Sequence, residues 1–350
     1  MRSIVVTVAL ALALPRFVAG QASPRPIPTV PASRATLVAD LSGVTRGFVT
    51  ANRARLHYLD FGGRGEPIVL LAGLGNTAWI WSDFGKRLAR EGFRVVALTR
   101  RAHGESEAPS AGYGLDTLAA DVIAVMDSLG FREAHLVGHS FGGAEMTRIA
   151  ARYPDRVLRL VYVDAAYDRA AQQRYDAAVP PPALAPGMTP NDRASLDAYL
   201  AYQRRARLDL ARFWGPVVER DFRASLLVDS LGQARWRHPF ARYGQMIDDV
   251  SRRPPEYGLV RAPALALYAT LSQAIAPVHA SVEQRAQIAR FERDNHQQWR
   301  AESMAQFQQG VSAGRTQEIA GVHHLFLDRP DETLRAIVSF LHAPAATLPR

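Results

Sequence analysis

The chain has 350 residues, of which 48% are hydrophobic and 21% are charged. This length and composition allow a large buried core, which excludes an intrinsically disordered chain and a polytopic membrane protein. The absence of cysteine excludes disulfides, thiol nucleophiles and cysteine metal sites. The net charge of +9 is carried almost entirely by scattered arginines, since Lys86 is the single lysine. Scattered charge is typical of a solvated surface and disfavours nucleic-acid binding.

The N-terminus has the pattern of an export signal. A basic start, an apolar run at residues 4–14 and small residues after it predict a signal peptide over residues 1–22, cleaved after Gly20 or Ala22. The run is shorter than the ~20 residues that span a bilayer, although an uncleaved anchor is an alternative. Residues 23–45, rich in Pro, Ser and Ala, predict a flexible leader. We therefore expect a periplasmic or secreted protein without a stable membrane span.

After the leader, apolar strand-length runs alternate with amphipathic helices. The expected strands lie at residues 49–59 (two short strands), 67–71, 94–98, 134–137 and 158–163, and the expected helices at 81–90, 115–129 and 142–153. Strands this apolar, separated by helices, indicate an α/β fold with a mostly parallel central sheet covered by helices on both faces.

The alternation breaks at residues 167–259, which are helical in pattern and rich in proline. We interpret this segment as an inserted helical cap, with the α/β core formed by residues 46–166 and 260–345. In the second core segment we expect strands at 264–268 and 316–319, and helices at 281–309 and 331–342.

The strongest chemical signal is Gly138-His139-Ser140-Phe141-Gly142-Gly143, placed between an expected strand and an expected helix. A serine hydroxyl is a weak nucleophile until a base takes its proton and the backbone exposes it. A sharp strand-to-helix turn exposes the serine, and its crowding requires small residues on both sides. Without that context, a glycine-rich turn with an incidental serine would be an adequate interpretation.

The segment resembles the nucleophile elbow of the α/β-hydrolase superfamily. Residues 70–76 resemble the family's His-Gly oxyanion loop, with Ala72 where histidine is usual. The resemblance implies that Ser140 is the nucleophile and that the backbone N–H groups of Leu74 and Phe141 form an oxyanion hole. Residues 101–106 resemble a structural Arg-Gly-His-Gly-x-Ser segment of the same family.

The resemblance places the general base after the last strand, where His323 and His324 are adjacent. Spacing back from Phe326 and Pro330 favours His323, and counting forward from Gly321 favours His324. We take His323 as the expected base and His324 as the alternative.

The third member of a triad is a carboxylate that orients the histidine. Many relatives carry the acid after the seventh strand, but residues 267–273 contain no carboxylate. Some members use the end of the sixth strand, and here that strand ends at Asp164. We expect Asp164 to orient the histidine, with Asp168 next and a dyad-like site as a third possibility.

These residues predict a serine hydrolase that cleaves a carboxylic ester, or a related acyl bond, of a small substrate without a metal or organic cofactor. Ester cleavage is expected by analogy with the family. An apolar substrate part would fit aromatic residues expected at the site: Trp79, Trp81, Phe141 and, from the cap, Trp214, Trp236 and Phe240.

Other activities fit part of the pattern. An inactive binding protein and a lyase or perhydrolase-like enzyme remain alternatives. Serine at the elbow disfavours dehalogenase and epoxide hydrolase chemistry, for which the relatives carry aspartate. A dinucleotide fingerprint, Gly73-x-Gly75-x-x-Ala78, is a weak match because the next strand ends in Thr99-Arg100 and not in a carboxylate.

Overall fold

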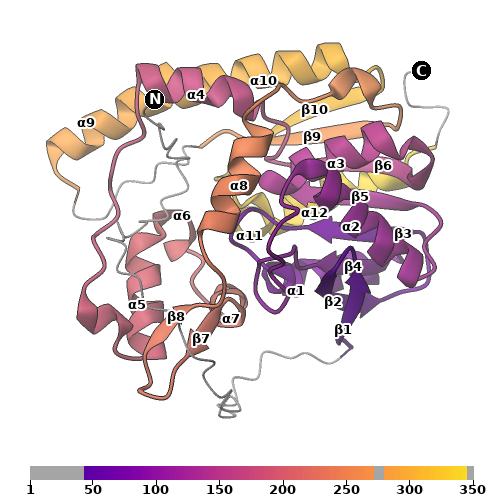
Figure 1. Ribbon diagram of the computed structural model, residues 1–350. Coiled ribbons are helices and arrows are strands. Elements are labelled where there is room, and N and C mark those ends of the chain that lie inside the picture. The colour runs from indigo at the N-terminus through magenta and orange to yellow at the C-terminus, as the bar shows by residue number, and fades with distance from the viewer. Residues whose placement is uncertain (1–42, 272–279, 345–350) are drawn as a thin grey trace.

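The computed structural model describes residues 43–271 and 280–344, so the predicted signal peptide and nearly all of the leader lie outside the described residues. An eight-stranded sheet in the order β1-β2-β4-β3-β5-β6-β9-β10 forms the centre of the fold (Figure 1). Its strands are β1 (Thr45–Ala51), β2 (Ala54–Gly62), β3 (Pro67–Leu71), β4 (Arg94–Leu98), β5 (Ala134–His139), β6 (Val157–Val163), β9 (Ala264–Ala269) and β10 (Gly314–Ile319). Strand β2 is antiparallel to both its neighbours, and all other pairings are parallel.

The strand sequences explain this arrangement. Every residue of β5 and β9 is buried, as expected for central parallel strands covered on both faces. At the antiparallel edge, Asn52 and Arg53 connect β1 to β2 with φ angles of 47° and 62°. Two consecutive residues of positive φ are the geometry of a tight hairpin turn. The two short strands predicted around this turn are confirmed.

Helices cover the sheet on both faces (Figure 1). One core cluster joins α1 (Ser82–Arg90) and α12 (Pro330–His342) to the sheet through Phe84, Ile337 and Phe340. The opposite cluster joins α2 (Leu115–Ser128), α3 (Phe141–Arg152) and α10 (Gln297–Gly310) through Met126, Met146 and Phe307. The predicted mostly parallel sheet between helical layers is therefore confirmed.

Between β6 and β9 the chain leaves the sheet for residues 164–263, which we call the insertion. It contains α4 (Arg169–Ala178), α5 (Leu196–Ala206), α6 (Leu208–Ala211), α7 (Pro216–Ala224), β7 (Leu226–Val228), β8 (Ala234–Trp236) and α8 (Ala241–Val250). Helix α4 lies beside α10, whereas α5, α6, α7 and the β7–β8 hairpin group together in a lobe (Figure 1). Val218 and Phe222 of this lobe belong to the same apolar cluster as Phe84 of the core. The hairpin corrects the all-helical expectation: Asp229 accepts hydrogen bonds from the N–H groups of Leu231 and Gln233 and closes a tight turn.

The long helix expected at residues 281–309 is present with an irregular middle. Helix α9 (Val282–Phe291) begins with a capping box between Ser281 and Gln284. A π-helical turn (Glu292–His296) then leads directly into α10. None of the helices within residues 43–271 and 280–344 has the length and apolarity needed to cross a membrane.

A buried ion pair fastens the β1–β2 turn to the rest of the core. Arg101 donates to both carboxylate oxygens of Asp121 on α2, at 2.6 and 2.7 Å, and also to the Gly112 carbonyl at 3.0 Å. Asn52 donates to the same carboxylate at 2.9 Å. Burial raises the pKa of Asp121 against the lowering effect of Arg101. Burial removes the hydration of both charges, and the hydrogen bonds between them fix the position of α2 relative to the β1–β2 turn.

We expect Arg101→Ala to lower the free energy of unfolding by about 3–5 kcal/mol, because it leaves the Asp121 carboxylate buried without its cation. Arg205→Ala is the matched control, since Arg205 is half exposed and pairs with Asp192 at the surface. The control should change stability by at most about 1 kcal/mol. Urea unfolding followed by circular dichroism measures both, and equal losses in the two variants would contradict the assignment.

Candidate active site

Ser140 occupies a strained turn between β5 and α3, with φ 53° and ψ −117°. Positive φ is rare for a residue with a side chain, and here the packing enforces it. A Cβ atom added to Gly142 would lie 2.6 Å from the Leu71 carbonyl oxygen, and one added to Gly143 would lie 2.2 Å from that of Ala165. The small residues of the motif thus let the turn fit between the ends of β3 and β6.

The loop after β3 lies directly against this turn. A Cβ atom on Gly73 would lie 3.2 Å from the Cβ atom of Ser140. The loop turns at Gly73–Asn76, where the Asn76 N–H donates to the Gly73 carbonyl at 3.2 Å and Gly75 has φ +85°. This is the geometry of a turn that requires glycine at its third position.

Two N–H groups at this place are free of backbone acceptors. Phe141 is the first residue of α3, so its N–H has no acceptor within the helix. Among the described residues, the Leu74 N–H has no backbone hydrogen bond. Both groups were predicted as oxyanion donors, and the structure puts their residues on the two segments that meet at Ser140.

Two buried side chains hold the loop from the core side. Arg100 donates to the Ala72 carbonyl at 2.8 Å, and its guanidinium is fixed by Glu145 of α3 at 2.6 Å. The Gly75 N–H donates to Nε2 of His103 at 3.1 Å, so the proton of that ring sits on Nδ1, 3.0 Å from the Arg101 carbonyl oxygen. Burial keeps the pKa of His103 well below its usual value, and the ring stays neutral in this role.

His323 and Asp164 meet across the carboxyl edge of the sheet. Nδ1 of His323 lies 2.6 Å from Oδ2 of Asp164, and the other oxygen accepts from the Ala269 N–H at 3.0 Å and the Tyr167 hydroxyl at 2.8 Å. Asp164 has φ 47°, so a second non-glycine residue of the site is in the left-handed region. Burial raises the pKa of the Asp164 carboxyl, but the hydrogen bond from His323 and the other donors outweigh it, and the net pKa is lowered.

The alternative residues occupy other positions. His324 is buried, and its ring packs on His139 with centroids 4.7 Å apart. Its Nδ1 atom lies 3.8 Å from Asp209, and burial lowers its pKa to about 3. Asp168 caps α4 by accepting from the N–H groups at the helix start. The structure therefore pairs His323, and neither alternative, with Asp164.

Sequence reasoning missed several residues of the site. Arg100, Glu145 and Tyr167 belong to no motif, and only the fold brings them to the loop and to Asp164. His139 is the variable position of the elbow motif, yet its Nε2 lies 3.1 Å from the His323 carbonyl oxygen. With Nε2 protonated, His139 donates to this carbonyl and helps to fix the loop that carries His323.

The aromatic residues expected to line the site mostly pack elsewhere. Trp81 is fully buried against Phe326, with centroids 4.2 Å apart, and Trp79 stacks on His57 at 6.0 Å. In the insertion, the Trp214 ring stacks on Phe222 at 5.2 Å. Trp236 and Phe240 contact each other at 5.4 Å, and Phe141 is covered in a cluster with Tyr243 of α8.

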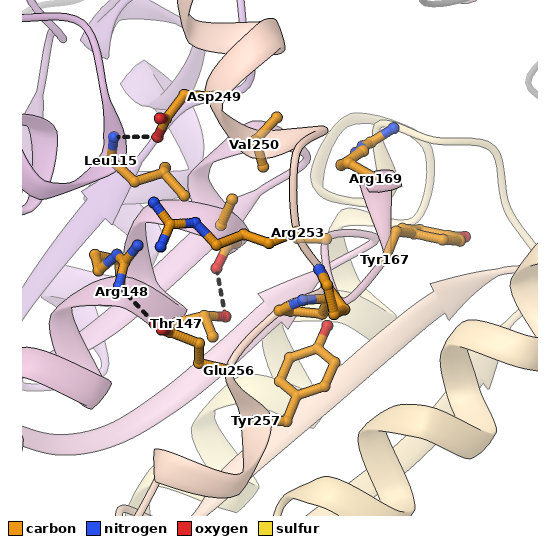
Figure 2. Close-up of a pocket in the computed structure, with 15 residues that line it drawn as sticks. Leu115, Thr147, Arg148, Tyr167, Arg169, Asp249, Val250, Arg253, Glu256 and Tyr257 are labelled. Carbon is orange, nitrogen blue, oxygen red and sulfur yellow. Dashed lines mark hydrogen bonds and ion pairs between the residues drawn. The ribbon is translucent and has the colours of Figure 1, made fainter. Parts of the chain in front are cut away.

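An open pocket of about 470 Å³, including solvent at its mouth, lies on the flank of the elbow (Figure 2). Gly143 and Thr147 of α3 form one wall, and residues 249–250 and 253–257, where the insertion returns to the core, form the other. Arg148 in this pocket is paired with Glu256 at 2.6 Å. Ser140, Asp164 and His323 are not among the lining residues, and each is less than 10% exposed. The insertion contacts their neighbours: Tyr243 of α8 shares a cluster with Phe141, and Asp209 lies 3.8 Å from His324.

No group of three or more His, Asp or Glu residues suited to a metal ion occurs within residues 43–271 and 280–344. The arrangement of Ser140, His323 and Asp164 is one that can perform proton transfer and nucleophilic attack with side chains alone.

Comparison with known proteins identifies the family to which this fold belongs. A family model described as "alpha/beta hydrolase fold" matches residues 66–297. The chain belongs to the α/β-hydrolase fold family.

Individual relatives are similar over only part of their length. A non-heme chloroperoxidase of Streptomyces lividans is 41% identical over 118 residues, 33% of this chain and 43% of the relative. An N-formylmaleamate deformylase of Pseudomonas putida is 36% identical over 138 residues, 39% and 51% of the two chains. The chain thus spans about half the length of these curated relatives. A crystal structure of E-2-(acetamidomethylene)succinate hydrolase superposes with a TM-score of 0.61 at 22% identity, covering 86% of this chain and 100% of that one, which shows the shared fold.

We expect Gly143→Ala to destabilise the protein by about 1–3 kcal/mol, because the new methyl group overlaps the Ala165 carbonyl oxygen. Gly244→Ala is the matched control: Gly244 lies inside α8, and an added Cβ meets only open space. The control should stabilise by up to about 1 kcal/mol through helix propensity. Thermal unfolding compares the two; a Gly143→Ala protein as stable as wild type would refute the crowded elbow.

Proposed function

We propose that this protein is a serine hydrolase that cleaves a carboxylic ester, or a related acyl bond, of a small and partly apolar substrate through an acyl-enzyme. The observation that carries the proposal is the 2.6 Å contact of His323 with Asp164 at the same sheet edge as the strained Ser140 turn. Family membership supports the hydrolase class. The ester is favoured by analogy with the family's commonest substrates.

The mechanism follows from the protonation states. An ionised Asp164 only accepts hydrogen bonds, so Nδ1 of His323 carries the proton and Nε2 is the basic nitrogen. Nε2 takes the Ser140 proton as the hydroxyl oxygen attacks the substrate carbonyl, and then passes it to the leaving alcohol. Asp164 stabilises the imidazolium formed in between. Water repeats the sequence on the acyl-enzyme and releases the acid.

The oxyanion formed in each half-reaction needs donors that are in place beforehand. The Phe141 N–H at the start of α3 and the Leu74 N–H of the turn after β3 are positioned for this role. The helix start adds a favourable partial charge. Because both donors belong to the main chain, Ala72 in place of the usual histidine leaves them intact.

The relatives include proteins named as a deformylase and as an epoxide hydrolase, which act on different bonds. The serine at position 140 favours acyl transfer, since it can form an ester with the substrate's acyl group. The insertion contacts residues next to the site, and we propose that it acts as a cap that limits substrate size. We propose an apolar substrate part because Phe141 directly follows Ser140 and because Trp214 and Trp236 of the insertion are only partly buried by their ring contacts.

We expect Ser140→Ala to lower kcat for p-nitrophenyl butyrate by roughly 10⁴–10⁶-fold, and Asp164→Asn by about 10⁴-fold, because the nucleophile or the tautomer is lost. His323→Gln should be as inactive as Ser140→Ala. His324→Gln is the matched control and should keep kcat within about threefold. Initial rates with a fluorophosphonate label on Ser140 test this set; an active His323→Gln beside an inactive His324→Gln would exchange the two roles.

We further propose that the chain is exported, on the basis of the signal-peptide pattern at residues 1–22. Expression of the full sequence in a Gram-negative host should give a periplasmic protein that begins at Gln21 or Ser23. Intact-mass analysis of the periplasmic and membrane fractions measures this outcome. A protein that keeps Met1 and stays with the membranes would instead support the uncleaved anchor.

A further inference from the structure

The insertion places a buried carboxylate directly on the oxyanion loop. Asp221, on α7 of the insertion, is 2% exposed. It accepts from the Thr77 N–H at 2.7 Å, the Thr77 hydroxyl at 2.6 Å and the Asn76 side-chain amide at 2.7 Å. Asn76 and Thr77 are the second and third residues after Leu74, and they are about 145 positions before Asp221 in the chain.

Asp221 completes the set of contacts that holds this loop. Arg100 holds its beginning through the Ala72 carbonyl, and His103 holds its middle through the Gly75 N–H. Asp221 holds its end, and of these three side chains it alone comes from the insertion. A turn fixed at its beginning, middle and end has little freedom left to rotate the Leu74 N–H.

The cost of burying this carboxylate supports a specific role. Burial raises the pKa of Asp221 to about 6, because the loss of hydration outweighs the hydrogen bonds from Thr77 and Asn76 and the nearby charge of Arg207. A buried carboxylate is expensive and contributes little net stability compared with an apolar side chain of similar size. Its three donors all belong to one loop, so its geometric effect is concentrated there.

The same part of the insertion reaches the histidine loop. Arg207 donates to both oxygens of Asp209, at 3.0 and 2.8 Å, and Asp209 lies 3.8 Å from His324. The lobe thus contacts the oxyanion loop through Asp221 and the residue next to His323 through Asp209. These two contacts fix the position of the lobe relative to the two loops next to Ser140.

We propose that Asp221 is a positioning residue: by binding Asn76 and Thr77 it sets the orientation of the Leu74 N–H, so that the oxyanion hole is complete only when the insertion is seated. This inference rests on the proposed function. It assigns to the insertion a part in transition-state stabilisation in addition to covering the substrate.

The test uses the mature protein with Asp221→Asn, which keeps the side-chain shape and removes an acceptor, and with Glu219→Gln as control. Glu219 lies on the same helix and pairs with Arg223 nearer the surface. Because displacing a reacting group by an ångström costs on the order of 10²-fold, we expect kcat for p-nitrophenyl butyrate to fall by about 10–100-fold in Asp221→Asn. KM should stay within about threefold, since ground-state binding does not use the oxyanion hole.

A second readout separates positioning from simple docking of the insertion. Phenylboronic acid forms a tetrahedral adduct with a reactive serine, and its inhibition constant should rise by about the same factor as kcat falls. Glu219→Gln should leave both values unchanged. Asn76→Ala removes a single donor from the loop side and provides a further variant should Asp221→Asn fold poorly; its kcat should fall in the same sense.

The outcomes are distinct. A loss confined to KM, or a fall in kcat with unchanged boronate inhibition, would overturn the positioning role, as would full activity of both Asp221→Asn and Asn76→Ala. Wild-type protein without any Ser140-dependent esterase activity would contradict the proposed function instead. In that case, hydrogen–deuterium exchange of residues 72–80 still reports whether Asp221→Asn frees the loop; unchanged exchange would overturn its hold on that segment.

Discussion

The sharp turn at Ser140 is the constraint on which the rest of the site depends. A side chain at φ 53° and ψ −117° costs on the order of 1–3 kcal/mol and persists only where its surroundings over-determine it. Here β5 lies between β3 and β6, so the turn is clamped by the Leu71 carbonyl on one side and the Ala165 carbonyl on the other. The same strand order brings the oxyanion loop after β3, the serine after β5 and Asp164 after β6 to adjacent places. In an open parallel sheet the carboxyl edge is the natural location for such a site.

Buried charges give this edge its fixed geometry. Arg100 with Glu145 and Arg101 with Asp121 are almost completely buried pairs in consecutive positions after β4. Such pairs add little net stability, but each fixes a direction: Arg100 points to the oxyanion loop, and Arg101 to α2 and the β1–β2 turn. The two pairs mainly orient the loops that they contact, because backbone groups at the ends of strands have few other hydrogen-bond partners.

The sequence predicted the parts of the site that are local. The elbow at residues 138–143 could be recognised because the turn requires small residues and these are all close together in the sequence. For the histidine, spacing favoured His323 but left His324 as an alternative, since neighbouring residues of a loop point in different directions and only the sheet edge decides which faces Asp164. The buried position of Trp81 and the β7–β8 hairpin were missed for a similar reason. Three-residue strands carry no clear periodicity, and tertiary packing decides their conformation.

The location of the acid on β6 explains why the insertion and the site are so closely joined. Asp164 is the first residue after β6, where the insertion begins, and three residues later Tyr167 donates its hydroxyl hydrogen bond to the carboxylate. Burial keeps the pKa of Tyr167 well above its usual value, so this hydroxyl remains a donor at any ordinary pH. An acid after β9 would lie at the far end of the insertion and could be held by the core alone. With the acid after β6, the carboxylate is oriented partly by the main chain of β9, through the Ala269 N–H, and partly by the insertion. The start of the insertion after β6 and the strand β9 that follows it therefore both contact the Asp164 carboxylate. The point where the insertion joins the core is thus part of the site.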